Sequence, residues 1–185
     1  MNLIFFKSQT FLTREIEHAL AKRGDIHSVV ITIPERISED SVESVYERIR
    51  QYLPAIVLSV NNAGYDFEGR LSELLVKSDS YQVNWDVDDP FFKGVFYNRR
   101  KPSMKNRLDF VSEASFVPRM NAAGYHAHFL PLGVDPAFFN TKTAVEYRRD
   151  IAFVGNSSME FLDTLMSGDS ENDLEKVAPL IARLK

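Results

Sequence analysis

Apolar and polar positions follow two recurring patterns along the first 130 residues. Short apolar runs, rich in β-branched and aromatic side chains, are typical of strands and occur at 2–6, 27–33, 55–60, 81–85, 107–111 and 127–133. Between them, apolar residues three or four positions apart predict helices around 12–20, 42–53, 71–75 and 116–123. This alternation predicts an α/β fold with a Rossmann-like, mostly parallel sheet and flanking helices.

Local signals support several of these boundaries. Gly24 is placed to end the first helix, and Pro54 to end the second. Ser38, followed by two acidic residues, is a candidate N-cap. The run 55–60 is almost continuously apolar, which is expected of a parallel strand covered on both faces.

A polar and charged segment interrupts this rhythm near residue 140. A new apolar strand pattern follows at 151–156, and helical patterns continue to residue 185. We therefore expect a first domain at 1–140, a linker at 141–150, and the beginning of a truncated second domain at 151–185. Unpaired apolar positions in that last part would favour a homodimer.

The amino-acid composition excludes some classes of function for this protein. The chain has 185 residues, no Cys and a formal net charge of −4. The absence of Cys excludes disulfides and thiolate metal sites, and the negative charge argues against nucleic acid as a partner. The early apolar run 3–6 is too short for a signal-peptide core or a membrane span, so we expect a cytoplasmic protein without a transmembrane segment.

The stretch NWDVDDPFFK, residues 84–93, carries the densest candidate chemistry. Asp86, Asp88 and Asp89 follow a predicted strand, and ligands of open α/β sheets bind at the carboxyl ends of strands. One of these carboxylates is a candidate general base. Alternatively, Asp86 and Asp88 share a divalent cation, or the stretch is structural, with Asp89 and Pro90 forming a turn.

Two further stretches carry weaker signals. Gly155, Asn156 and Ser157 follow a predicted strand and open a predicted helix, where backbone N–H groups can hold a phosphate; the alternative is an ordinary turn. Basic residues gather between 93 and 107, which suits either an anionic partner or a solvated loop.

Four short sequence motifs occur in a characteristic order: FFKS with REIEHAL, then W…DDP, PLGVDP and FVG. Together they resemble GT-B glycosyltransferases, and more closely the CgeB-type spore-maturation branch, over residues 5–156. The resemblance implies the N-terminal, acceptor-side domain of such an enzyme, followed by the start of its nucleotide-sugar domain. The implied reaction is transfer of a hexose-like sugar from a nucleotide-sugar donor to a hydroxyl acceptor, with no metal and no further cofactor.

The resemblance also assigns roles to residues. Residues 155–157 would line the donor side of the cleft. The acceptor side would be formed by the ends of several predicted strands, by the tryptophan beside the carboxylates, and by the motif that leads into the second domain. The substrate-binding residues implied in this way are Lys7, Ser8, Asn61, Asn62, Trp85, Gly133 and Asp135.

Two other functions stay open. A metal-dependent GT-A-type transferase would use Asp86 and Asp88 to hold its cation. A non-catalytic Rossmann-like binding or interaction module would explain why so little of the second domain is present.

Overall fold

The computed structural model describes residues 2–8, 12–34, 37–66, 68–91 and 105–139. The chain divides into two units, Met1–Thr141 and Lys142–Lys185, and every described residue belongs to the first. The predicted linker, the second domain, the donor-side residues Gly155, Asn156 and Ser157, and most of the basic stretch lie outside the described residues. Those expectations therefore stay predictions.

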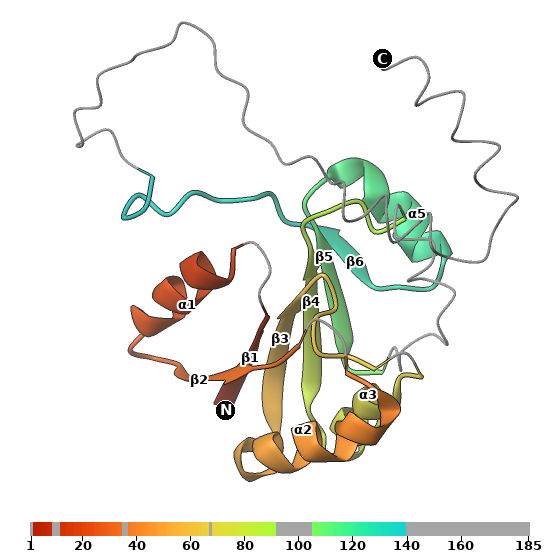
Figure 1. Ribbon diagram of the computed structural model, residues 1–185. Helices are drawn as coiled ribbons and strands as arrows, with labels where there is room; N and C mark the ends of the chain where they lie inside the picture. Colours follow the sequence, from red (N-terminus) through yellow and green to blue (C-terminus); the bar gives the residue numbers. More distant parts are fainter. Residues whose placement is uncertain (1, 9–11, 35–36, 67, 92–104, 140–185) are drawn as a thin grey trace, which may run out of the picture. The chain divides into compact units, whose positions relative to one another are not determined.

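The described part is built on a six-stranded parallel sheet in the order β2-β1-β3-β4-β5-β6 (Figure 1). All six predicted strands are present. Their bounds are β1 Asn2–Lys7, β2 His27–Thr32, β3 Ala55–Val60, β4 Tyr81–Asp86, β5 Arg107–Val111 and β6 Ala127–Phe129. The predicted α/β, Rossmann-like class is confirmed.

Four described α-helices connect these strands: α1 Thr13–Ala21, α2 Val42–Ile49, α3 Arg70–Lys77 and α5 Val117–Ala122. Short 3-10 turns extend α2 at both ends, Glu39–Ser41 and Arg50–Tyr52, and another, Ala114–Phe116, precedes α5. Among the described residues, no helix combines the length and apolar character that crossing a membrane requires.

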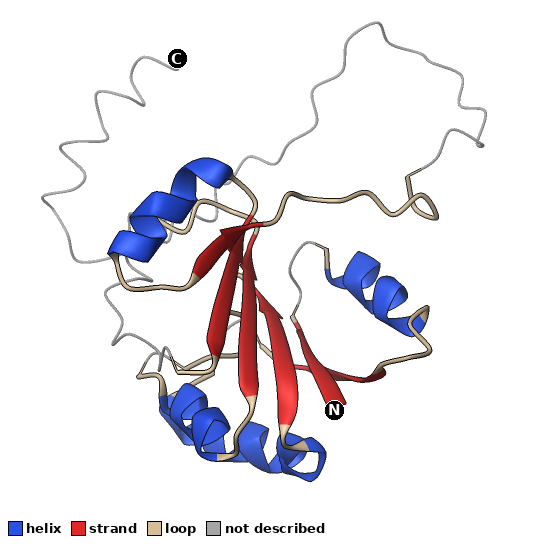
Figure 2. Ribbon diagram, turned by 180° about the vertical axis from the view of Figure 1, so that it is seen from behind, coloured by secondary structure: helices blue, strands red, loops and turns tan. Residues whose placement is uncertain are grey.

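The strand order separates α1 from the other helices. The chain moves one way along the sheet from β1 to β2 and the opposite way from β2 to β3. Because such crossovers are right-handed, α1 and α2 cover opposite faces. Figure 2 shows α1 beside the N-terminal strand, apart from α2 and α3.

The main core lies between the sheet and α2 and α3. Apolar residues of β1 and β3 meet those of the two helices there. Its fully buried members include Ile4, Val57, Val42, Ile49 and Leu71. A smaller cluster forms where α5 covers β5 and β6, around Val111, Met120 and Ala127. The face that carries α2 and α3 is thus well packed and holds the sheet in place.

Two boundaries differ from the sequence expectation. The predicted strand 127–133 ends at Phe129. Leu130 still donates its N–H to the Val111 carbonyl, but Pro131 has no N–H with which to continue the ladder. Ser38 stands at the expected N-cap position, yet its hydroxyl pairs with the Ser41 hydroxyl and makes no side-chain cap bond.

Helix α3 is capped from a distance by Asp66. The two carboxylate oxygens of Asp66 accept the backbone N–H groups of Arg70 and Leu71, both at 2.8 Å, and Asp66 itself is buried. This arrangement satisfies two of the N–H groups that a helix leaves unpaired at its start. The cap holds the first turn of α3 against the sheet.

Removing this cap should destabilise the protein. We expect Asp66→Ala to lower the free energy of unfolding by about 0.5–2 kcal/mol, the usual range for a lost N-terminal cap. Hydrogen exchange of the Arg70 and Leu71 amides should accelerate in parallel. Glu68→Ala, at an exposed neighbouring position, is the control and should change neither quantity. Unchanged exchange at both amides in the Asp66 variant would contradict the cap.

Candidate functional site

The sheet has a topological switch point between β1 and β3. From β1 the chain passes to β2 on one side, while β3 lies on the other side and continues toward β4. In open parallel sheets, ligands bind in the crevice at the carboxyl ends of the strands that flank such a point. Lys7 ends β1, and Asn61 and Asn62 directly follow β3. The sequence-predicted residues at these two positions therefore lie at the switch point.

On the β1 side, Lys7 faces helix α1. Its Nζ pairs with the Glu17 carboxylate at 2.6 Å, and both side chains are partly exposed. Ser8 is buried directly after it. This ion pair ties the end of β1 to α1, so Lys7 has a structural contact in addition to its predicted binding role.

On the β3 side, two asparagines form the turn. Asn61 and Asn62 have positive φ angles of 51° and 57°, a conformation that Asn adopts more readily than most residues. The Asn61 side chain bridges to the loop after β4: its Oδ1 accepts the Val87 N–H at 3.0 Å, and its Nδ2 donates to Asp88 Oδ2 at 2.8 Å. Asn61 thereby fixes the position of the Asp88 carboxylate.

The three predicted carboxylates have different environments. Asp88 and Asp89 are exposed, whereas Asp86 is only 2% exposed. Asp89 Oδ1 accepts the Phe91 N–H at 2.7 Å, which closes a local turn around Pro90. Of the three, Asp88 is the exposed carboxylate that the turn after β3 holds in place through Asn61.

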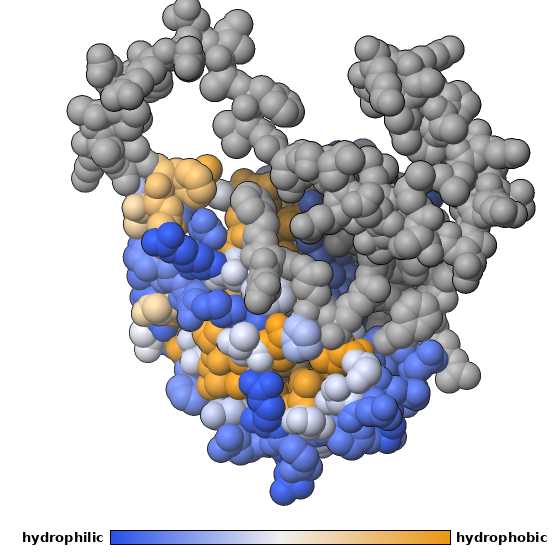
Figure 3. Space-filling view, in the orientation of Figure 1, coloured by the Kyte–Doolittle hydropathy of each residue, from blue (hydrophilic) through white to orange (hydrophobic). Residues whose placement is uncertain are grey.

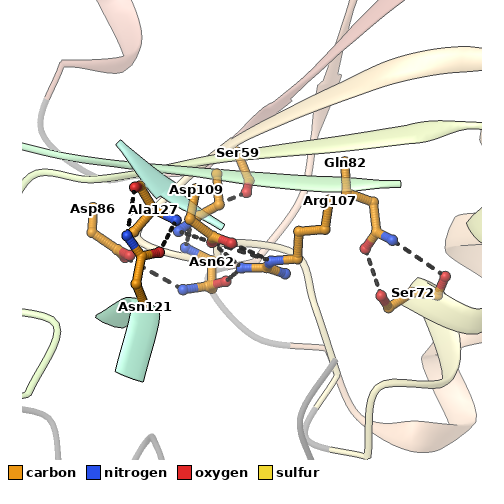
Figure 4. Close-up of polar contacts among 10 residues, drawn as sticks. Ser59, Asn62, Ser72, Gln82, Asp86, Arg107, Asp109, Asn121 and Ala127 are labelled. Carbon is orange, nitrogen blue, oxygen red and sulfur yellow. Dashed lines mark hydrogen bonds and ion pairs between the residues drawn. The ribbon is translucent and has the colours of Figure 1, made fainter. Parts of the chain in front are cut away.

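Asp86 instead belongs to a buried polar network (Figure 4). Its Oδ1 accepts a long hydrogen bond of 3.4 Å from Asn62 Nδ2, and the Asn62 Oδ1 accepts from the Arg107 guanidinium at 2.6 Å. Asp86 and Asp88 thus contact different partners, Asn62 and Asn61. Within the part of the chain that the structure describes, no cluster of three or more acidic or histidine side chains is arranged to hold a metal ion.

The network continues as a row across the sheet. Ser59, Asn84 and Asp109 are register partners on β3, β4 and β5. The Ser59 hydroxyl donates to Asn84 Oδ1 at 3.2 Å, and Asn84 Nδ2 donates to Asp109 at 3.4 Å. Asn84 Oδ1 also accepts the Asn62 N–H at 2.7 Å. The row therefore links the interior of the sheet to the turn at the switch point.

An ion pair between Arg107 and Asp109 anchors this row. The guanidinium contacts the carboxylate at 2.7 Å, and the two side chains are 1% and 0% exposed. Burial is the largest single influence on the pKa of the Arg107 guanidinium and lowers it. The attraction of Asp109, the hydrogen bonds to it and the nearby Tyr65 and Asp86 together outweigh burial, so the pKa stays above its ordinary value. The buried Tyr65 ring lies 5.7 Å from this guanidinium, and burial raises the pKa of its hydroxyl.

A cavity of about 410 Å³ lies on the opposite face of β4, beside α1. Successive strand residues point to opposite faces, so Trp85 lines this cavity while Asn84 and Asp86 face the buried network. The Trp85 indole N–H donates to the Leu130 carbonyl at 3.1 Å, which fixes the ring. The cavity is lined by Leu12, Glu15, Ile16, Ala19, Lys22, Trp85, Gly133, Val134, Asp135 and Pro136.

Asp135 joins the segment after β6 to helix α1. Its Oδ2 lies 2.6 Å from His18 Nδ1, its Oδ1 accepts the Ala137 N–H, and Lys22 approaches to 3.9 Å. Chiefly through the hydrogen bond with His18, and further through that with Ala137, the pKa of the Asp135 carboxyl is lowered. Phe138 packs edge-on against the His18 ring and under the Arg14 guanidinium. These contacts close the cavity on one side.

The segment from Phe129 to Phe139 exposes much apolar surface. Five of its large hydrophobic side chains are 40% or more exposed: Phe129, Leu130, Leu132, Val134 and Phe139. Figure 3, in the orientation of Figure 1, shows hydrophobic surface where the end of this segment lies. The wall of the cavity thus belongs to an unusually apolar stretch of the described surface.

The sequence-predicted residues therefore fall into three groups. The first group lies at or beside the switch point: Lys7, Asn61 and Asn62 at the ends of β1 and β3, and Asp88 at the neighbouring end of β4. The second group lines the cavity: Trp85, Gly133 and Asp135. Asp86 is buried below the edge. Sequence reasoning missed the contribution of α1 and the buried Arg107–Asp109 pair. The sequence could have predicted this pair, because residues two positions apart on a strand point to the same face. No feature of the sequence predicts the contact of His18 with Asp135, which lies 117 residues away.

The fold and the position of these polar side chains define the described part as a Rossmann-like α/β domain with a polar site at its switch point. Comparison of the chain with family models, with curated proteins and with solved structures finds no match.

Proposed function

We propose that the chain is the acceptor-side part of a GT-B-type glycosyltransferase that moves a sugar from a nucleotide-sugar donor to a hydroxyl acceptor. The observation that carries this proposal is Asp88, an exposed carboxylate after the carboxyl end of β4. Asn61, in the turn after β3 beside the switch point, holds it at 2.8 Å. The order of the four sequence motifs supports the same class.

In this proposal Asp88 is the general base. The acceptor hydroxyl oxygen attacks the anomeric carbon of the donor sugar, the bond from that carbon to the diphosphate oxygen breaks, and the nucleoside diphosphate leaves. Asp88 takes the proton of the attacking hydroxyl. A positioned base of this kind contributes about 10²–10⁴-fold to rate. Asn61 keeps the carboxylate oriented toward the edge of the sheet, and Asp86 supports the turn from below through Asn62.

Release of nucleoside diphosphate tests this function. The protein is incubated with a panel of nucleotide sugars and simple alcohols, and the liberated diphosphate is measured. We expect turnover that falls at least about 100-fold in Asp88→Asn, because the amide cannot accept the proton. Asp79→Asn is the matched control: Asp79 is an exposed aspartate that precedes β4, at the other end of the strand.

Three outcomes would count against the proposal. Absence of diphosphate release across the panel would favour a non-catalytic binding module. An equal loss in the Asp88 and Asp79 variants would remove Asp88 from the role of base. Activity that collapses in EDTA and returns with Mn²⁺ or Mg²⁺ would favour the metal-dependent GT-A-type reaction instead.

A further inference from the structure

The cavity beside α1 has the size of a small-molecule site. Its volume of about 410 Å³ lies within the roughly 300–1,000 Å³ that such sites occupy. None of the residues of α1, all of which the structure describes, is buried. Ile16 and Ala19 of this helix, together with Leu12 at its N-cap, line the cavity. The helix therefore forms one wall of a hollow space beside the sheet.

The lining of the cavity is predominantly apolar. Trp85 contributes the aromatic surface from β4, and Val134 and Pro136 contribute aliphatic surface from the segment after β6. Val134 is 70% exposed. Apolar surface in contact with water is unfavourable, and a ligand of similar character would release that water. The walls thus favour a ligand with an apolar body.

Two polar side chains of the lining, Asp135 and Trp85, already make hydrogen bonds within the protein. Asp135 accepts from His18 and from the Ala137 N–H, and the Trp85 N–H is donated to Leu130. Glu15 and Lys22 are the other two charged residues of the lining. The hydroxyls of a sugar that face the apolar walls would lose their contacts with water and find few partners there, which is unfavourable. An apolar molecule with one or two hydroxyl groups fits the apolar walls and the few polar groups of this cavity better.

The cavity is also connected to the candidate base. The carbonyl of Trp85 accepts the N–H of Asn61 at 3.0 Å, and Asn61 in turn holds Asp88. The backbone of Trp85 and the Asp88 carboxylate are therefore linked through Asn61 at the end of β4.

We propose that this cavity binds a small, mainly apolar alcohol, and that such a molecule is the acceptor. Its role as acceptor rests on the proposed function, whereas its binding does not. The apolar body lies against Trp85, Ile16 and Val134, and the hydroxyl points out of the cavity at the carboxyl edge.

Trp85 is a built-in probe of this binding, because it is the only tryptophan of the chain. The probes are borneol, a compact alicyclic alcohol that does not absorb where tryptophan does, and methyl glucoside, a fully hydroxylated molecule of comparable size. We expect borneol to shift the Trp85 emission saturably toward shorter wavelength, as the indole becomes less hydrated. Methyl glucoside should leave the emission unchanged over the same concentrations.

A cavity-filling variant and its matched control locate the site. Ala19→Phe places a ring in the lining and should weaken borneol binding at least about tenfold. Ala21→Phe introduces the same ring two residues further along α1, outside the lining, and should bind borneol as the unmodified protein does. Both positions are exposed, so neither change should prevent folding.

Failures of the two proposals are distinguishable. A shift with methyl glucoside but not with borneol, no shift with either, or equal effects of the two phenylalanine variants would each overturn the apolar-acceptor inference. The emission assay contains no nucleotide sugar, so a failure of sugar transfer leaves it unaffected. Borneol binding without any transfer would keep the apolar site and reject the transferase.

Discussion

Replacing Arg107 by Leu is expected to lower the free energy of unfolding by about 3–5 kcal/mol, the range measured when one partner of a buried ion pair is removed. The side chains of Arg107 and Asp109 are 1% and 0% exposed, so the substitution leaves the Asp109 carboxylate charged and unpaired inside the protein. It also removes the 2.6 Å bond that holds Asn62. We expect the turn at the switch point to loosen together with the core.

Urea unfolding followed by Trp85 emission measures this change. Arg23→Leu is the matched control, because it breaks a pair with Asp25 whose side chains are 59% and 64% exposed. Exposed pairs contribute little, and the control should keep the unfolding midpoint of the unmodified protein. If the two leucine variants unfold at the same urea concentration, the buried pair does not stabilise the fold as we infer.

A double variant separates the charge from the packing. Arg107→Leu with Asp109→Leu removes both charges, so no unpaired carboxylate stays buried. Paired apolar replacements of buried ions are often close to neutral. We therefore expect the double variant to be more stable than Arg107→Leu alone. A double variant that is less stable would indicate that the pair acts mainly through its hydrogen bonds with Asn62 and Asn84.

Gly64→Ala is the second change for which we expect a large effect, a loss of about 2–4 kcal/mol. An added Cβ would lie 1.8 Å from Ile33 Cδ1 and 2.9 Å from Phe6 Cδ2, both on buried side chains. Overpacking of a core typically destabilises by about 1–3 kcal/mol. The positive φ of 83° adds about 1 kcal/mol, because side chains with a Cβ are disfavoured there.

Gly24→Ala is the matched control for Gly64→Ala. No heavy atom lies within 4 Å of a Cβ added at Gly24, so the same chemical change should leave stability nearly unaltered. Thermal or urea unfolding of both variants gives the answer. Nearly equal stability of the two would show that Ile33 and Phe6 can move aside and that the turn after β3 is less tightly packed than the distances indicate.

The strands illustrate what a sequence pattern can predict. The residues of β3 and β5 form short apolar or alternating runs whose bounds coincide with the structure, since a strand in a covered sheet must be apolar on at least one face. The end of β6 was less predictable. The apolar run continues past Phe129, but pairing stops at Pro131, which cannot donate to the ladder.

The candidate site shows where prediction from local pattern ends. The position of Asp86, Asp88 and Asp89 at the end of a strand followed from the sequence, but the difference among them did not. Only the neighbouring strands decide that Asp86 is buried with Asn62 while Asp88 is held at the surface by Asn61. Spacing along one strand carries no information about partners 24 or 27 residues away.

By itself, the sequence determined the fold class and the edge at which the polar residues gather, because hydrophobic periodicity and strand ends are local properties of the chain. The tertiary structure decided which of those residues share a site. It brought α1 beside Trp85 and the segment after β6, joined His18 to Asp135, and buried Arg107 against Asp109. These contacts depend on strand order and crossover handedness, which place segments distant in the sequence side by side.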